Sequence, residues 1–127
     1  AARAQPRRCG ARRFAAGPRL TREPRLEAAA LAHARDLARH GRFDHEGSDG
    51  SDARTRVERQ GYAAQRVGEN LAAGATTPEE VVQGWLDSPG HCANLMDARF
   101  TEMGLAYAVD SRSAAGIYWT QLFATPR

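Results

Sequence analysis

The sequence predicts a single α+β domain in which helices cover both faces of a mainly antiparallel sheet. Residues 24–40 place apolar side chains at every third or fourth position, which is typical of a helix with one buried stripe. Residues 102–109 alternate bulky and small side chains, as expected for a strand with a helix packed closely on its small-residue face. In residues 117–123, both the odd-numbered and the even-numbered positions carry mostly apolar side chains, which indicates a strand buried on both faces. The polar segment 110–116 fits a hairpin loop between these strands.

Length and composition agree with this class. The chain has 127 residues, of which 42% are hydrophobic and 26% charged, as in ordinary globular domains with a hydrophobic core. No apolar run reaches the length of a membrane-spanning helix. Composition therefore excludes the disordered and membrane-spanning classes and leaves the function open.

Charge divides the chain into two parts. All 18 basic residues are arginine, and eight of them lie in residues 1–25 beside one acid, Glu23, which gives about +7. The rest holds ten arginines and fourteen acids, so its net charge is −4. We expect an Arg-rich arm over residues 1–22, partly helical and packed on a domain over residues 23–127. Phe14 is the only aromatic residue of the arm, and no nucleic-acid motif is present, so we expect no nucleic-acid partner.

The first helix has clear signals at both ends. Pro24 suits the first helical position, and the acids Glu23 and Glu27 lie where the helix dipole favours negative charge. Gly41 fits a left-handed cap after the last turn. A shorter helix is predicted over residues 52–60.

The middle of the chain continues with a strand and a second amphipathic helix. Ser51 is the expected cap of the short helix, and residues 65–71 are predicted to be extended. Thr77 begins a capping box that opens a helix over residues 77–87, with Trp85 on its buried side.

The next segment opens with Ser88, which is predicted to cap a short helix, and with Pro89 at its first position. It reads Ser-Pro-Gly-His at 88–91, then Ala-Asn-Leu-Met at 93–96 and Phe-Thr-Glu-Met-Gly at 100–104. Two upstream motifs accompany it, Phe-Asp-His at 43–45 and Gly-Glu-Asn at 68–70.

Together these motifs resemble the bacterial branch of the CAP superfamily, which comprises the SCP-domain proteins. This group includes cysteine-rich secretory proteins, insect venom antigens and plant pathogenesis-related type 1 proteins. The resemblance covers about residues 26 to 124 and implies a three-layer α-β-α sandwich of the α+β class. It also implies an exported monomer, extracellular or periplasmic, whose signal peptide is absent from this chain.

The resemblance also implies a ligand-binding cleft. Family members often carry two histidines and two acids there, and His45, Glu69 and His91 match three of these positions, while Ser88 occupies the position of the second acid. Two imidazoles suit zinc or another divalent metal, so His45 and His91 are the predicted metal ligands, and Glu69 would be a third ligand or orient a water. In the alternative interpretation, Glu69 binds backbone or histidine groups and holds the loops together.

Three functional hypotheses remain open. The first is a non-enzymatic extracellular module that binds a small molecule, a lipid or a cell-envelope ligand at His45, Glu69, Ser88 and His91. The second is a metal-assisted hydrolase that uses His45, His91 and Glu69, with the histidines as metal ligands and with Glu69 and His91 in catalytic roles. The third is a polyanion-binding surface protein that uses the Arg-rich arm.

Cys9 and Cys92 are the only cysteines, and their spacing suits neither a redox pair nor a zinc knuckle. From the residues alone, the two cysteines could form one disulfide or remain as two free thiols. The resemblance to an exported family favours the disulfide.

Overall fold

The computed structural model describes residues 2–127, so Ala1, the first residue of the predicted arm, lies outside the described residues. No helix in this range has both the length and the apolar character needed to cross a membrane. The elements in chain order are a 3₁₀ turn, η1 (Ala2–Ala4), β1 (Arg7–Cys9), β2 (Arg12–Phe14), β3 (Thr21–Arg22), α1 (Pro24–His40), α2 (Ala53–Arg59), β4 (Ala64–Ala73), α3 (Pro78–Leu86), α4 (Pro89–Met96), β5 (Glu102–Val109) and β6 (Ile117–Pro126).

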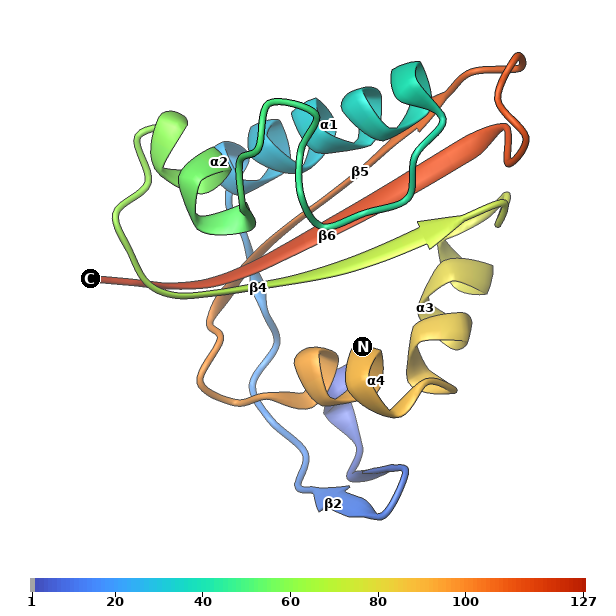
Figure 1. The fold of residues 1–127 in the computed structure, drawn as a ribbon. Helices are drawn as coiled ribbons and strands as arrows, with labels where there is room; N and C mark the ends of the chain where they lie inside the picture. Colours follow the sequence, from blue (N-terminus) through green and yellow to red (C-terminus); the bar gives the residue numbers. More distant parts are fainter. Residues whose placement is uncertain (1) are drawn as a thin grey trace.

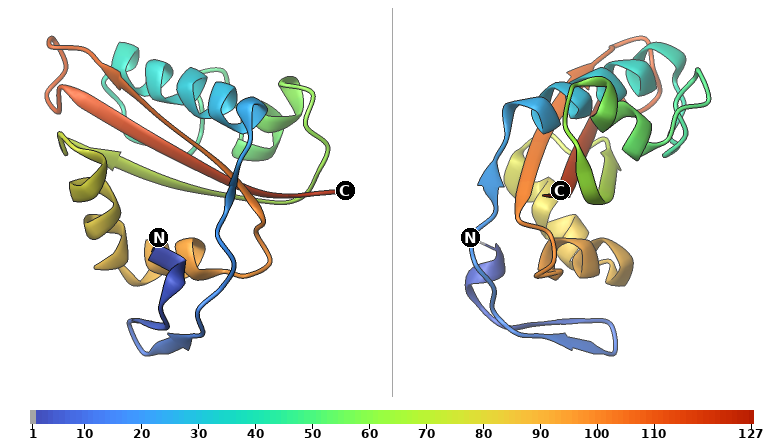
Figure 2. Two further views of the ribbon diagram at one scale, coloured as in Figure 1. Left: turned by 180° about the vertical axis from the view of Figure 1, so that it is seen from behind. Right: turned by 90° about the vertical axis from the view of Figure 1, so that its left-hand side faces the viewer.

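The fold has three layers (Figure 1). The middle layer is a four-stranded sheet of order β3-β5-β6-β4, in which only the β3–β5 pair is parallel. Helices α1 and α2 cover one face, and α3 and α4 lie on the other, as the turned views also show (Figure 2). The predicted α+β class with helices on both sides of a mainly antiparallel sheet is confirmed.

Helix α1 lies directly on β5 because one face of that strand is nearly bare. A side chain at Gly104 would collide with the backbone of Leu26 and Glu27 in the first turn of α1. The helix begins with Pro24 and ends at Gly41, whose φ of 59° is left-handed, as predicted. The close contact fixes α1, and with it the start of the following loop, relative to the sheet.

The opposite face is covered by an aromatic cluster beneath α3. Trp85 is buried there with Phe100, Trp119 and Phe123, the last two from β6. Its indole Nε1 donates a hydrogen bond to the carbonyl oxygen of Leu71 at 2.9 Å. Trp85 is therefore a core residue, and the predicted burial of β6 on both faces is confirmed.

The helix caps differ in part from the prediction. Thr77 caps α3 as expected, because its hydroxyl accepts from the backbone N–H of Glu80 at 3.1 Å. The cap of α2 is Asp52 instead of Ser51, and its carboxylate accepts from the backbone N–H of Thr55 at 2.8 Å. Ser88 occupies the cap position of α4 but makes no side-chain cap bond, because its hydroxyl is bonded to a histidine ring described below.

The Arg-rich arm is mostly extended and only briefly helical. Its one helical turn is η1, and β1 and β2 form an antiparallel hairpin that projects from the body (Figure 2). Gly10 begins the two-residue hairpin loop with a φ of 61°, the positive value that the first position of a type II′ turn requires. At the end of the arm, β3 joins the sheet through the pair Thr21 and Glu102. The arm is thus anchored to the body at both ends.

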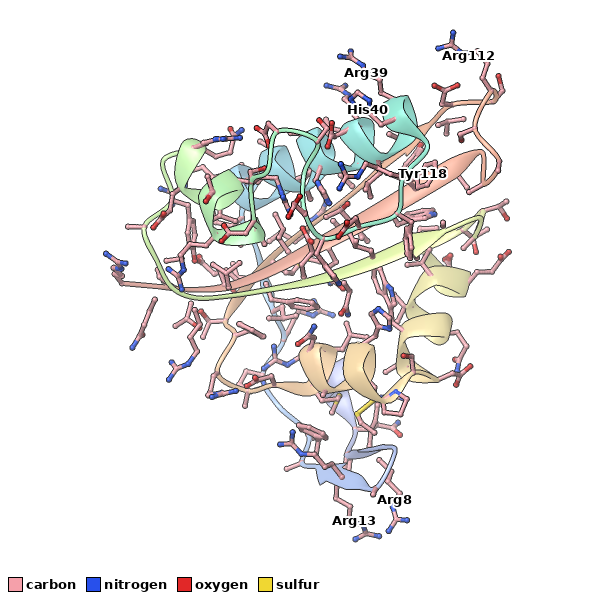
Figure 3. All side chains as sticks on the ribbon, in the orientation of Figure 1. Arg8, Arg13, Arg39, His40, Arg112 and Tyr118 are labelled. Atoms are coloured by element: carbon pink, nitrogen blue, oxygen red, sulfur yellow. A yellow bond between two sulfur atoms is a disulfide. The ribbon has the colours of Figure 1, made fainter. Side chains whose placement is uncertain are left out.

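Cys9 and Cys92 form the predicted disulfide, which joins the hairpin to α4. Both cysteines are buried and pack with Met96. Figure 3 shows the sulfur–sulfur bond between the hairpin and the helix.

Reducing this disulfide is expected to lower the free energy of unfolding by about 2–4 kcal/mol, because the crosslink restricts the unfolded chain. The two cysteines are 83 positions apart, so a long loop is released. Urea unfolding with and without reductant measures the effect. A Cys9→Ser/Cys92→Ser variant should be insensitive to reductant, and equal wild-type midpoints in both conditions would contradict the prediction.

Candidate functional site

The site is built around Glu69 on β4, whose side chain is only 3% exposed. Its Oε1 accepts from Nδ1 of His45 at 2.9 Å, and its Oε2 accepts from Nη2 of Arg56 at 2.9 Å. An ionised carboxylate only accepts, so the proton of a neutral His45 ring lies on Nδ1 and its Nε2 keeps a free lone pair. The His45 ring itself is 64% exposed. Both oxygens of the buried acid are therefore engaged, and the imidazole faces solvent.

Arg56 ties the loop before α2 to β4. Its Nη2 also donates to the backbone oxygen of His45 at 2.8 Å, and its Nη1 donates to the backbone oxygen of Ser51 at 2.7 Å. Sequence reasoning missed this residue, because an arginine in a short amphipathic helix normally points into solvent. No local signal identifies it. Its role depends on an acid 13 positions later in the chain.

The second histidine is presented by α4. Nδ1 of His91 lies 2.9 Å from the hydroxyl oxygen of Ser88, one turn earlier. The backbone oxygen of His91 accepts from Nδ2 of Asn70 at 3.1 Å, and Nδ2 of Asn94 donates to Oδ1 of Asn70 at 3.0 Å. Asn70 and Asn94, which the sequence motifs contain without assigning a role, thus join α4 to β4 beside Glu69.

The ring of His91 is partly buried on α4. Burial lowers the pKa of His91 below its usual value, and the charge of His45 nearby lowers it further. His45 therefore lies close enough to His91 for its charge to act on that ring. His33, by contrast, is fully buried inside α1, where its Nε2 lies 2.9 Å from the backbone oxygen of Asp44. His33 belongs to the core.

The four predicted site residues therefore form two pairs, His45 with Glu69 and Ser88 with His91. Within residues 2–127, no group of three or more His, Cys, Asp or Glu side chains is arranged to hold a metal ion. The neighbouring Asp87 points away and accepts from Nε2 of Gln83 at 3.0 Å.

The arrangement offers two imidazole Nε2 atoms at the surface, each on a ring oriented through Nδ1. Histidines that bind metals are held in this way by a partner on the other ring nitrogen. Open zinc sites usually have three protein ligands and a water. Glu69 fits poorly as the third ligand, because its side chain is 3% exposed and both of its oxygens already accept hydrogen bonds from His45 and Arg56. Among the four predicted residues, the two Nε2 atoms are thus the nitrogens that no described hydrogen bond engages.

Comparison with known proteins places these residues in a family. The sequence matches the cysteine-rich secretory protein (CAP) family over residues 10–123. It is 34% identical over 98 residues to the uncharacterized protein YkwD of Bacillus subtilis (strain 168), a match that covers 77% of this chain and 36% of YkwD.

Two solved structures are similar to this chain. An extracellular SCP-domain protein from Bacillus anthracis is 28% identical with a TM-score of 0.74, and the match covers 85% of this chain and 34% of that one. An outer surface protein of Borrelia burgdorferi shares the fold, with a TM-score of 0.76 at 22% identity, over 87% of this chain and 80% of that one.

The chain spans about a third of the two Bacillus proteins that it matches. The family match covers most of the chain and includes His45, Glu69 and His91, together with β4, α4 and β5, which position the site. The chain belongs to the CAP family, the cysteine-rich secretory protein family.

Proposed function

We propose that this chain is the exported CAP domain of an extracellular or surface protein and that it acts as a ligand-binding module. The extracellular and outer-surface relatives support export. The Cys9–Cys92 disulfide is consistent with it, because disulfides persist in oxidising compartments. The binding site is the surface formed by His45, Glu69, Ser88 and His91.

One observation carries the proposal. Both imidazoles are oriented through Nδ1, by Glu69 and by Ser88. Among the hydrogen bonds of the described chain, none engages Nε2 of His45 or of His91. With the proton of each ring on Nδ1, the two Nε2 lone pairs form a preorganised site, and a divalent transition metal such as zinc is the ligand that they suit best. A metal bound there would offer its remaining positions to a second ligand.

Zinc binding tests the site. His45→Ala and His91→Ala are each expected to weaken zinc binding by about tenfold or more, since each removes one of two donors. Titration calorimetry on protein purified without a nickel column measures the affinity. His40→Ala is the matched control, because His40 is exposed at the end of α1 with its Nε2 3.4 Å from Asp36. Equal zinc affinity in wild type and both site variants would contradict the proposal.

The contacts of Glu69 favour binding over hydrolysis. A general base must reach the proton that it removes, directly or through one water. Glu69 is buried and is bonded through both oxygens, so its role is to orient His45 and to neutralise Arg56. Zinc-dependent hydrolysis of p-nitrophenyl acetate that disappears in Glu69→Gln, with zinc affinity unchanged, would favour the hydrolase instead.

A further inference from the structure

The β1–β2 hairpin carries a pair of opposed arginines on its outer side. Arg8 and Arg13 are directly paired across the two strands. Successive residues of a strand point to opposite faces, and Cys9 and Phe14 face α4, where they pack with Cys92 and Met96. Arg8 and Arg13 therefore point away from the body, and both are exposed. Figure 3 shows the two side chains projecting from the same end of the molecule.

This pairing is unfavourable for the hairpin alone. Like charges directly opposite each other on neighbouring strands destabilise the pair, because their Cβ atoms are only about 5 Å apart. In the described part of the chain, neither arginine forms an ion pair with a carboxylate. The disulfide at Cys9, next to Arg8, holds the hairpin on α4 despite this repulsion. An anion between the two guanidinium groups would relieve the repulsion.

A cavity of about 390 Å³ adjoins the pair and is lined by Pro6, Arg7, Arg8, Arg13 and Phe14. Arg7 lies on the other face of β1, with Cys9, and its Nε donates to the backbone oxygen of Ala2 at 2.7 Å. The two outer guanidinium groups, with no acid among the lining residues, match the charge and the fork geometry of phosphate.

We propose that Arg8 and Arg13 bind the phosphodiester groups of an extracellular polyol phosphate polymer. This site lies on the hairpin and is independent of the histidine site. It also goes beyond the proposed function of that site.

Two observations select this class of polyanion. The large exposed apolar side chains of the described chain are Phe43, Tyr107 and Val109, none of them on the hairpin, so the hairpin has nothing to insert into a bilayer. Single-stranded nucleic acid is held by stacking bases on aromatic rings. The hairpin's only ring, Phe14, has the guanidinium of Arg12 over it at 4.7 Å and packs against the disulfide cluster. A phosphodiester chain without bases needs neither insertion nor stacking, and it suits two exposed guanidinium groups.

Titration with poly(glycerol phosphate) at several salt concentrations tests the proposal. The double variant Arg8→Gln/Arg13→Gln is expected to weaken binding at low salt by about tenfold or more. It should also flatten the plot of log K against log salt concentration by about 1.4, as expected for two lost phosphate contacts on a single-stranded polyanion. Arg39→Gln is the control, because Arg39 is exposed at the opposite end of the molecule (Figure 3). It should bind as the wild type does.

Each other outcome overturns the proposal. Equal weakening by Arg39→Gln would mean that only net charge matters. Tighter binding to phosphatidylglycerol vesicles or to a single-stranded oligonucleotide than to the polymer would show that the polymer is not the preferred polyanion. Absence of polymer binding by the wild type would show that the hairpin has no such site. A melting temperature no lower than that of the wild type and an intact disulfide by mass spectrometry show that the variants are folded.

Discussion

Glu69→Ala is expected to lower the free energy of unfolding by about 3–5 kcal/mol, because it leaves a buried cation without its partner. The side chain of Arg56 is 7% exposed, and Glu69 is its only carboxylate partner among the described residues. The same substitution frees the ring of His45, so the site should lose its order as well as its stability. Urea unfolding measures the loss.

Two further variants test whether this loss of stability comes from the unpaired buried charge. Arg99→Ala breaks a pair with Asp97 in which the Arg99 side chain is 66% exposed, and it should cost far less stability than Glu69→Ala. Glu69→Ala/Arg56→Met removes both buried charges and should recover part of the lost stability. A loss below about 1 kcal/mol in Glu69→Ala itself would mean that water solvates Arg56 as well as the carboxylate does.

Trp85→Ala is expected to cost about 3–5 kcal/mol, because it opens a cavity in the aromatic cluster under α3. The indole is 2% exposed, and its removal also leaves the carbonyl oxygen of Leu71 without its donor. Val109→Ala, at a position that is 65% exposed, is the control and should change stability by no more than about 0.5 kcal/mol. A loss below about 1 kcal/mol in denaturant titration of Trp85→Ala would contradict the packing described here.

Local periodicity was enough to predict most of the elements. The apolar stripe of α1, the bare face of β5 and the doubly buried β6 are properties of single segments, and each determines which neighbour the segment can accept. The bare face of β5 even predicted how closely a helix would lie, because only Gly104 leaves room for the backbone of α1.

The sequence did not reveal features that depend on distant partners. The hairpin segment, from Arg7 to Phe14, has no apolar alternation of its own, and its buried contacts come from Cys92 and Met96 on α4. Arg56 is buried because Glu69 lies beneath it. Ser88 was expected to cap α4 on local grounds, but its hydroxyl binds the ring of His91 instead. In each case a tertiary contact overrides the local preference.

The position of β6 bears on the order in which the molecule assembles. This strand follows all the others in the chain, yet it lies between β5 and β4 and takes part in two of the three strand pairings of the sheet. Until β6 has been synthesised, β4 has no strand to pair with in this sheet. Glu69, which lies on β4, then has no fixed position from which to orient His45. Pairings between segments far apart in sequence form slowly, because a long loop must close first. During synthesis, Glu69 can therefore hold His45 in place on the sheet only after β6 has emerged.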